Sequence, residues 1–129
     1  MSSGDRIVVT IPRDEGFEDV AQLVLGGVAS RVNLGYESLD DLGTGVAALL
    51  ERRDADAELT VQFDIGDALI ATLVGPFRGG SMRAELEHVE GGVTLRRVLE
   101  TVVDEFQAVH RADGEWVELR KRLEARSGS

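Results

Sequence analysis

Two adjacent glycines, Gly91 and Gly92, stand directly before a segment with regular helical spacing. Glycine has no Cβ, so the backbone here can adopt a positive φ or lie very close to another group. The first turn of a helix has free N–H groups and a partial positive charge, both of which favour a bound phosphate. Arg96 falls in that turn, where its charge needs either an anion or the nearby carboxylate of Glu100. The pattern therefore allows a phosphate-binding loop, or a surface loop followed by an Arg96–Glu100 ion pair.

Other residues that could do chemistry do not form a recognisable site. His88 and His110 are far apart and lack carboxylates at ligand spacing, so no metal site is expected. The chain has no cysteine, which excludes disulfides and thiolate metal sites, and no serine has an adjacent base. An Asp-x-Gly motif at Asp64 to Gly66 lies in an expected hairpin turn, and we interpret it as part of that turn.

Three segments have the apolar spacing of amphipathic helices. The helix after Gly92 is expected to end near Val103 or Asp104, and a second covers 17 to 32, where Gly26 and Gly27 predict a close crossing with another element. A third begins at Ser38, whose hydroxyl can form a capping box with Asp41. In this helix Gly43 and Gly45 are expected contact points for a neighbour.

Strands are predicted where β-branched or alternating residues are bounded by turn residues. A connection from Gly75 to Glu90, unusually long for a compact domain, could hold a short helix and act as a lid. The order of elements predicts an α+β fold, a two-layer α/β sandwich with a mixed, mostly antiparallel sheet and three helices on one face. We expect a single domain over 1–129, with a core at about 6–123 and flexible ends. The predicted strands are Arg6 to Ile11, Glu58 to Ile65, Ala68 to Val74, Glu105 to His110 and Glu115 to Leu123.

The composition is that of a soluble globular protein, with 43% hydrophobic and 29% charged residues. The net charge of -10 repels nucleic acid and anionic membranes, so direct binding to either is not expected. The N-terminal segment is charged and interrupted by Pro12, unlike a signal peptide or a membrane anchor. A cytoplasmic location follows as the default expectation.

Three stretches carry a resemblance to a known family: IVVTIPRDEGFEDVAQLVLGGVA, LDDLGTGVAALLE, and GGVTLRRVLETVVDEF with the following EWVELRKRL. Over roughly residues 6 to 123 the chain resembles the small serine-kinase anti-sigma factors of bacteria, within the histidine-kinase-like ATPase superfamily. The resemblance implies that superfamily's fold and two activities. One is binding of a sigma factor; the other is phosphorylation of a serine on a small antagonist protein with ATP and magnesium.

Residue by residue, the chain departs from the family at the positions that do the chemistry. The family has a catalytic Glu and, four residues later, a magnesium-binding Asn, but Ala48 and Arg52 stand in these places. A methyl group takes no proton, and a guanidinium has no lone pair for a metal. Val74 and Gly75 stand where the family's adenine-binding Asp is expected. No catalytic residue is therefore predicted, and Gly75, Gly91, Gly92 and Arg96 are the candidates for a vestigial nucleotide-binding loop.

The resulting prediction is an anti-sigma-like regulatory protein that acts by protein–protein binding, with no cofactor and no metal. Its expected partner is a sigma factor or an anti-anti-sigma protein, and a homodimer is expected. Two alternatives stay open: an active protein serine kinase that uses ATP and magnesium through displaced groups, and a non-catalytic subunit that dimerises with an intact relative.

Overall fold

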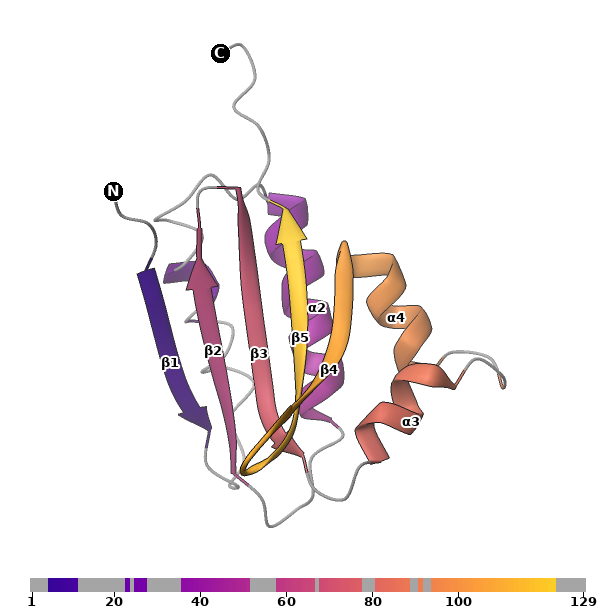
Figure 1. The fold of residues 1–129 in the computed structure, drawn as a ribbon. Coiled ribbons are helices and arrows are strands. Elements are labelled where there is room, and N and C mark those ends of the chain that lie inside the picture. Colours follow the sequence, from indigo (N-terminus) through magenta and orange to yellow (C-terminus); the bar gives the residue numbers. More distant parts are fainter. Residues whose placement is uncertain are drawn as a thin grey trace.

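The chain was described from a computed structural model, drawn in Figure 1. The structure describes residues 5–11, 23, 25–27, 36–51, 58–66, 68–77, 81–88, 91 and 94–122. Within these ranges a sheet of five strands lies beside a layer of helices. The strands are β1 (Asp5–Ile11), β2 (Leu59–Ile65), β3 (Leu69–Phe77), β4 (Glu105–Arg111) and β5 (Gly114–Arg122), and the helices are α2 (Tyr36–Leu50), α3 (Ser81–Glu87) and α4 (Leu95–Val102).

The strands follow the order β1-β2-β3-β5-β4 across the sheet, and each of the four pairings is antiparallel. The five predicted strands are confirmed to within a few residues. A mixed sheet needs a parallel pair, and the strands in the described ranges contain none. β3 also continues to Phe77, past the predicted break at Gly75, with a shift of register against β5 between Val74 and Phe77.

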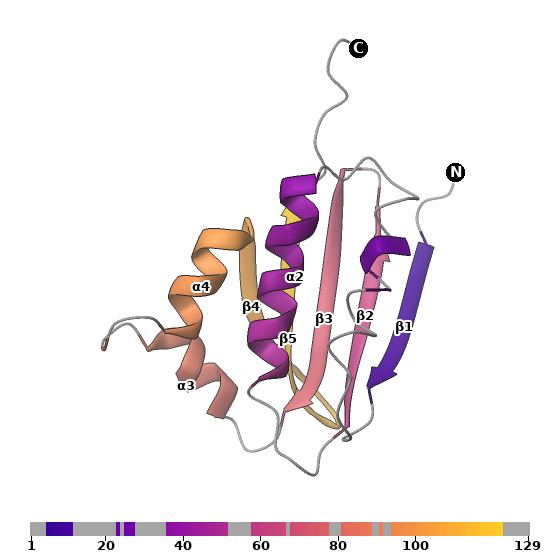
Figure 2. The same cartoon turned by 180° about the vertical axis from the view of Figure 1, so that it is seen from behind.

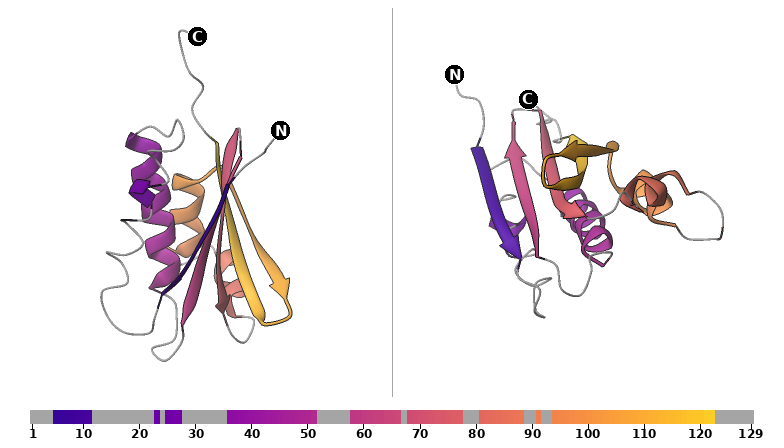
Figure 3. Two further views of the ribbon diagram at one scale, coloured as in Figure 1. Left: turned by 90° about the vertical axis from the view of Figure 1, so that its left-hand side faces the viewer. Right: turned by 60° about the horizontal axis from the view of Figure 1, so that its bottom comes forward.

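Alternation along the strands decides which face meets the helices. In β2, the buried side chains Leu59, Val61, Phe63 and Ile65 belong to the core, whereas the residues between them are half-exposed. Figure 2 shows α2 in front of the sheet with α3 and α4 beside β4, and in Figure 3 α2 and α4 lie on the same side of the sheet. No helix within the described ranges covers the other side, so the predicted α+β two-layer sandwich is confirmed. We call the uncovered side the open face.

The core lies between the sheet and α2 and α4. Leu42, Val46, Leu49 and Leu50 of α2 are buried there, and Leu95, Leu99 and Val102 of α4 join them. Lys121 of β5 links both helices to the sheet, because its Nζ donates to the carbonyl oxygen of Val102 at 3.0 Å and to Asp41 Oδ2 at 3.4 Å.

The helix predictions have mixed outcomes. α4 is confirmed, with an end at Val102 close to the expected one. α2 begins at Tyr36, so Ser38 lies inside the helix. The prediction that Ser38 caps this helix is therefore wrong. Of the helix expected over 17 to 32, only residues 23 and 25–27 are described, and they are helical.

The glycines of these helices also differ from one another in their surroundings. An ideal Cβ on Gly26 or Gly27 would meet no described atom within 4 Å beyond its own helix backbone and chain neighbours, so the predicted close crossing is not seen among the described residues. The contact predicted at Gly45 is confirmed. A Cβ there would lie 3.3 Å from Leu119 Cδ1 and 3.4 Å from Val102 Cγ2.

Candidate functional site

Ala48, which the resemblance places at the position of a catalytic Glu, lies on α2 and is half-buried. It packs against the hydrophobic core that α2 shares with the sheet. Arg52, in the place of the magnesium ligand, lies outside the described residues. Ala48 thus contributes an apolar contact.

Gly75 is buried in β3, and the structure gives a packing reason for a glycine there. A Cβ at this position would lie 2.7 Å from both Cγ and Cδ2 of Trp116, closer than Cβ atoms pack, and 3.0 Å from the carbonyl oxygen of Glu115. Val117 and Leu119 of β5 belong to the core on the helix side, so alternation puts Trp116 on the open face. The indole ring therefore fills the space next to Gly75 on that face.

The proposed phosphate loop is described only in part. Gly91 has a φ of +93°, a backbone conformation that glycine adopts more readily than other residues. Gly92 lies outside the described residues. Thr94 is buried and caps α4: its Oγ1 accepts a hydrogen bond from the backbone N–H of Arg97 at 3.2 Å. This cap was not predicted from the sequence, although a threonine directly before the first apolar residue of a helix is a usual N-cap signal.

Arg96 is already paired. Its Nε lies 2.9 Å from Glu100 Oε2 along the same helix, and its Nη1 donates to the carbonyl oxygen of Leu86 in α3 at 3.4 Å. The ion pair between Arg96 and Glu100 that the sequence allowed is present. The same side chain joins α3 to α4, and Leu86 itself is buried in the core, so the segment expected to act as a lid is anchored at this point.

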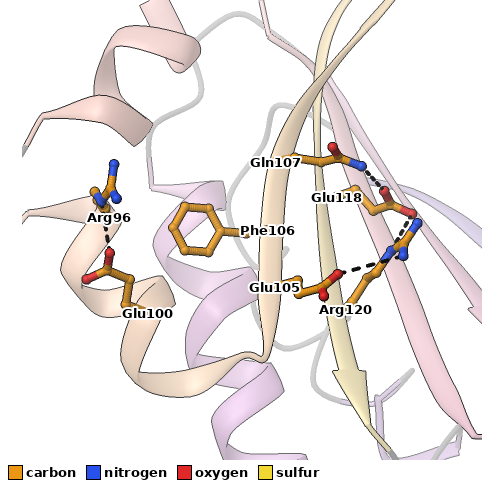
Figure 4. Close-up of a pocket in the computed structure, with 7 residues that line it drawn as sticks. All are labelled: Arg96, Glu100, Glu105, Phe106, Gln107, Glu118 and Arg120. Carbon is orange, nitrogen blue, oxygen red and sulfur yellow. Dashed lines mark hydrogen bonds and ion pairs between the residues drawn. The ribbon is translucent and has the colours of Figure 1, made fainter.

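A hollow of about 460 Å³ runs along β4, which is the edge strand next to β5 in the sheet. We call it the β4 hollow. Figure 4 shows Phe106 projecting from β4 toward α4, which carries Arg96 and Glu100. The other lining residues lie across the strand from Phe106. The lining consists of Arg96, Glu100, Glu105, Phe106, Gln107, Glu118 and Arg120.

Ion pairs and hydrogen bonds connect the polar side chains of this lining. Arg120 Nη1 lies 3.7 Å from Glu105 Oε1, and Arg120 Nε lies 3.5 Å from Glu118 Oε2. Gln107 Nε2 donates to Glu118 Oε1 at 2.8 Å. The hollow offers an aromatic ring, charged groups and an amide, which suits recognition of another molecule. Of its residues, only Arg96 was a candidate from the sequence.

Other candidate chemistry finds little support in the geometry. His88 and His110 are both exposed, and within the described ranges no three His, Cys, Asp or Glu residues are grouped as a metal site requires. The helices in these ranges include none with the length and apolar character needed to cross a membrane.

Comparison with models of known protein families gave no match to this chain, and a search of curated proteins gave none either.

Proposed function

We propose that the protein is an anti-sigma-like regulator of bacterial transcription that acts by binding a partner protein, with ATP and magnesium chemistry lost. The partner is a sigma factor or an anti-anti-sigma protein, and the regulator is a cytoplasmic homodimer. The observation that carries the proposal is Ala48, whose methyl group packs against the core at the position where the resemblance requires a catalytic carboxylate.

Two further contacts support the loss of nucleotide chemistry. Trp116 fills the space beside Gly75, the residue in the place of the adenine-binding Asp. Arg96, in the first turn of α4 after the vestigial loop, is paired with Glu100 and does not need an anion. The adjacent first turn of α4 is already capped by Thr94.

Thermal unfolding with and without millimolar ATP and magnesium tests the loss of nucleotide binding. A ligand at 100 times its Kd stabilises a protein by about 2.7 kcal/mol, which is a shift of several degrees for a domain of this size. We expect no shift, with an active anti-sigma kinase as positive control. A clear shift, together with transfer of labelled phosphate to a serine of an anti-anti-sigma protein, would establish the kinase alternative instead.

Transcription assays test the regulatory part of the proposal. RNA polymerase carrying each sigma factor of the source organism is assayed with and without the purified protein. We expect transcription from one sigma-dependent promoter to be inhibited. The protein should bind its partner equally well when it is mixed with it before the assay in the absence of ATP. If transcription is inhibited with none of the sigma factors, and the protein binds no anti-anti-sigma protein, the regulatory proposal is refuted. Light scattering over a range of concentrations measures the expected dimer.

A further inference from the structure

We propose that β4 binds an extended peptide segment of a partner protein, which adds to the sheet as a further strand and lies in the β4 hollow. The segment has alternating basic and apolar residues. This inference goes beyond the proposed function, since it names a peptide-binding edge that neither ATP chemistry nor sigma-factor binding requires.

β4 lies at one edge of the sheet. The strand order places β5 on one side of β4, and the described ranges contain no strand on its other side. The backbone of an edge strand has N–H and C=O groups that can pair with an added strand. Addition of an extended peptide to such an edge is a recurring mode of recognition.

The β4 hollow follows this edge and is lined from both faces of the sheet. Phe106 and Ala108 pack against the core on the helix side, so alternation puts Glu105 and Gln107 on the open face. Figure 4 shows this division, with Phe106 on the side of α4 and Glu105, Gln107, Glu118 and Arg120 on the other side. A hollow that touches side chains of both faces leaves room at the edge between them.

The two faces of β4 determine which side chains the added segment would carry. Side chains of an added strand alternate between the two faces in the same way as those of β4. One row would meet the half-buried ring of Phe106, which favours apolar residues there. The other row would meet Glu105, whose side chain is 66% exposed, and Gln107.

Charge favours a basic segment. The lining holds three carboxylates, Glu100, Glu105 and Glu118, against the two guanidinium groups of Arg96 and Arg120. The chain as a whole has a net charge of -10, which attracts a cationic segment over a longer range. Lysine or arginine in the row that faces Glu105 would complement both.

The helices beside the edge favour a single segment over a second copy of this chain. Figures 1 and 3 show α3 and α4 extending past β4 at this side of the sheet. Two copies joined edge to edge through β4 would bring these helices and their counterparts together. A single added strand brings no second set of helices to this edge.

The test uses the full chain and a fluorescein-labelled peptide of about seven residues in which lysine and valine alternate, the length of a typical strand. Binding is measured by fluorescence anisotropy at low and physiological salt. We expect saturable binding by the lysine peptide and none by the same peptide with glutamate at the lysine positions. Proline in place of the central valine removes a backbone donor and should also abolish binding.

Two charge reversals locate the site. Glu105→Lys should weaken binding about tenfold or more, because it adds a like charge beside the basic row. Glu58→Lys makes the same change of net charge at an exposed residue next to β2, which β3 and β5 separate from β4, and should leave the affinity nearly unchanged. Circular dichroism confirms that both variants are folded.

Amide hydrogen exchange shows whether the peptide adds as a strand. With bound peptide, we expect slower exchange over 105–111, while β1 at the opposite edge of the sheet is unchanged. Three results would overturn the proposal: no saturable binding at millimolar peptide, equal weakening by both charge reversals, or binding without slower exchange in β4. A shift to dimers that excludes the peptide would assign the edge to a second copy instead, and would also overturn it.

Discussion

The indole ring of Trp116 occupies the space that any side chain on Gly75 would need, with two ring atoms 2.7 Å from the position of an ideal Cβ. The two residues belong to neighbouring strands, β3 and β5, at the point where the register between these strands shifts. The contact explains a buried glycine in the interior of a strand, where glycine is otherwise unfavourable.

Gly75→Ala is therefore expected to lower the free energy of unfolding by about 1–3 kcal/mol, the usual cost of forcing extra atoms into a packed site. Urea unfolding followed by circular dichroism measures the change. In a Trp116→Ala background the clash with the ring is gone and only the 3.0 Å contact with the carbonyl oxygen of Glu115 remains, so the same substitution should cost less. Equal costs in the two backgrounds would show that the ring is not the obstacle.

Lys121→Met should lower the free energy of unfolding by about 1–2 kcal/mol, because it removes the bond from Nζ to the carbonyl oxygen of Val102 at the end of α4. The side chain is only 14% exposed, so water replaces the lost partner poorly. Asp41→Asn keeps the bond to Val102 and removes only the ion pair with a half-exposed carboxylate. It should cost less than about 1 kcal/mol. A larger cost for Asp41→Asn than for Lys121→Met would contradict this division.

Thr72→Val should raise the free energy of unfolding by about 1 kcal/mol. The residue is fully buried, and its Oγ1 has no hydrogen-bond partner among the described residues. Valine has a similar shape and removes the buried hydroxyl that lacks a partner. Thr60→Val in β2 is the matched control, because that hydroxyl lies 3.3 Å from Thr10 Oγ1. The control should be neutral or destabilising; a loss of stability in Thr72→Val would point to a bound water or a ligand at the hydroxyl.

Gly26→Ala should raise the free energy of unfolding by about 0.5–1 kcal/mol, the difference in helix propensity between the two residues. The residue is helical and exposed, and an added Cβ meets no described neighbour within 4 Å. Gly45→Ala gains the same propensity but places its methyl 3.3 Å from Leu119, so its net effect should be smaller or unfavourable. Thermal unfolding of the two variants makes the comparison, and a gain at Gly45 larger than at Gly26 would contradict it.

Local patterns were sufficient to predict most elements of this fold. Alternation in β2 and helical spacing in α4 each follow from which side chains must be buried, and both were predicted close to their observed bounds. The start of α2 was missed because a serine followed by an acid resembles a cap, whereas the helix begins earlier, at Tyr36. Several turns can satisfy such a local signal, and packing selects among them.

Relationships between distant segments could not be predicted in the same way. The pairing of Val74 with Val117 makes β5 the neighbour of β3 and leaves β4 at the edge, and no local pattern encodes that order. Glu105 and Gln107 resemble polar residues of any exposed strand. They become part of a hollow only because α4 places Arg96 and Glu100 beside the same edge.

Trp116 gives the molecule a built-in optical reporter, because it is the only tryptophan in the chain. Its indole N–H donates to Asp113 Oδ1 at 2.8 Å, and the guanidinium carbon of Arg111 lies 4.6 Å from the ring centroid. Intrinsic emission excited at the indole absorption band therefore originates at one corner, the turn that joins β4 to β5. Loosening of that corner alone would change the colour and intensity of the emitted light even while the far strands stay intact.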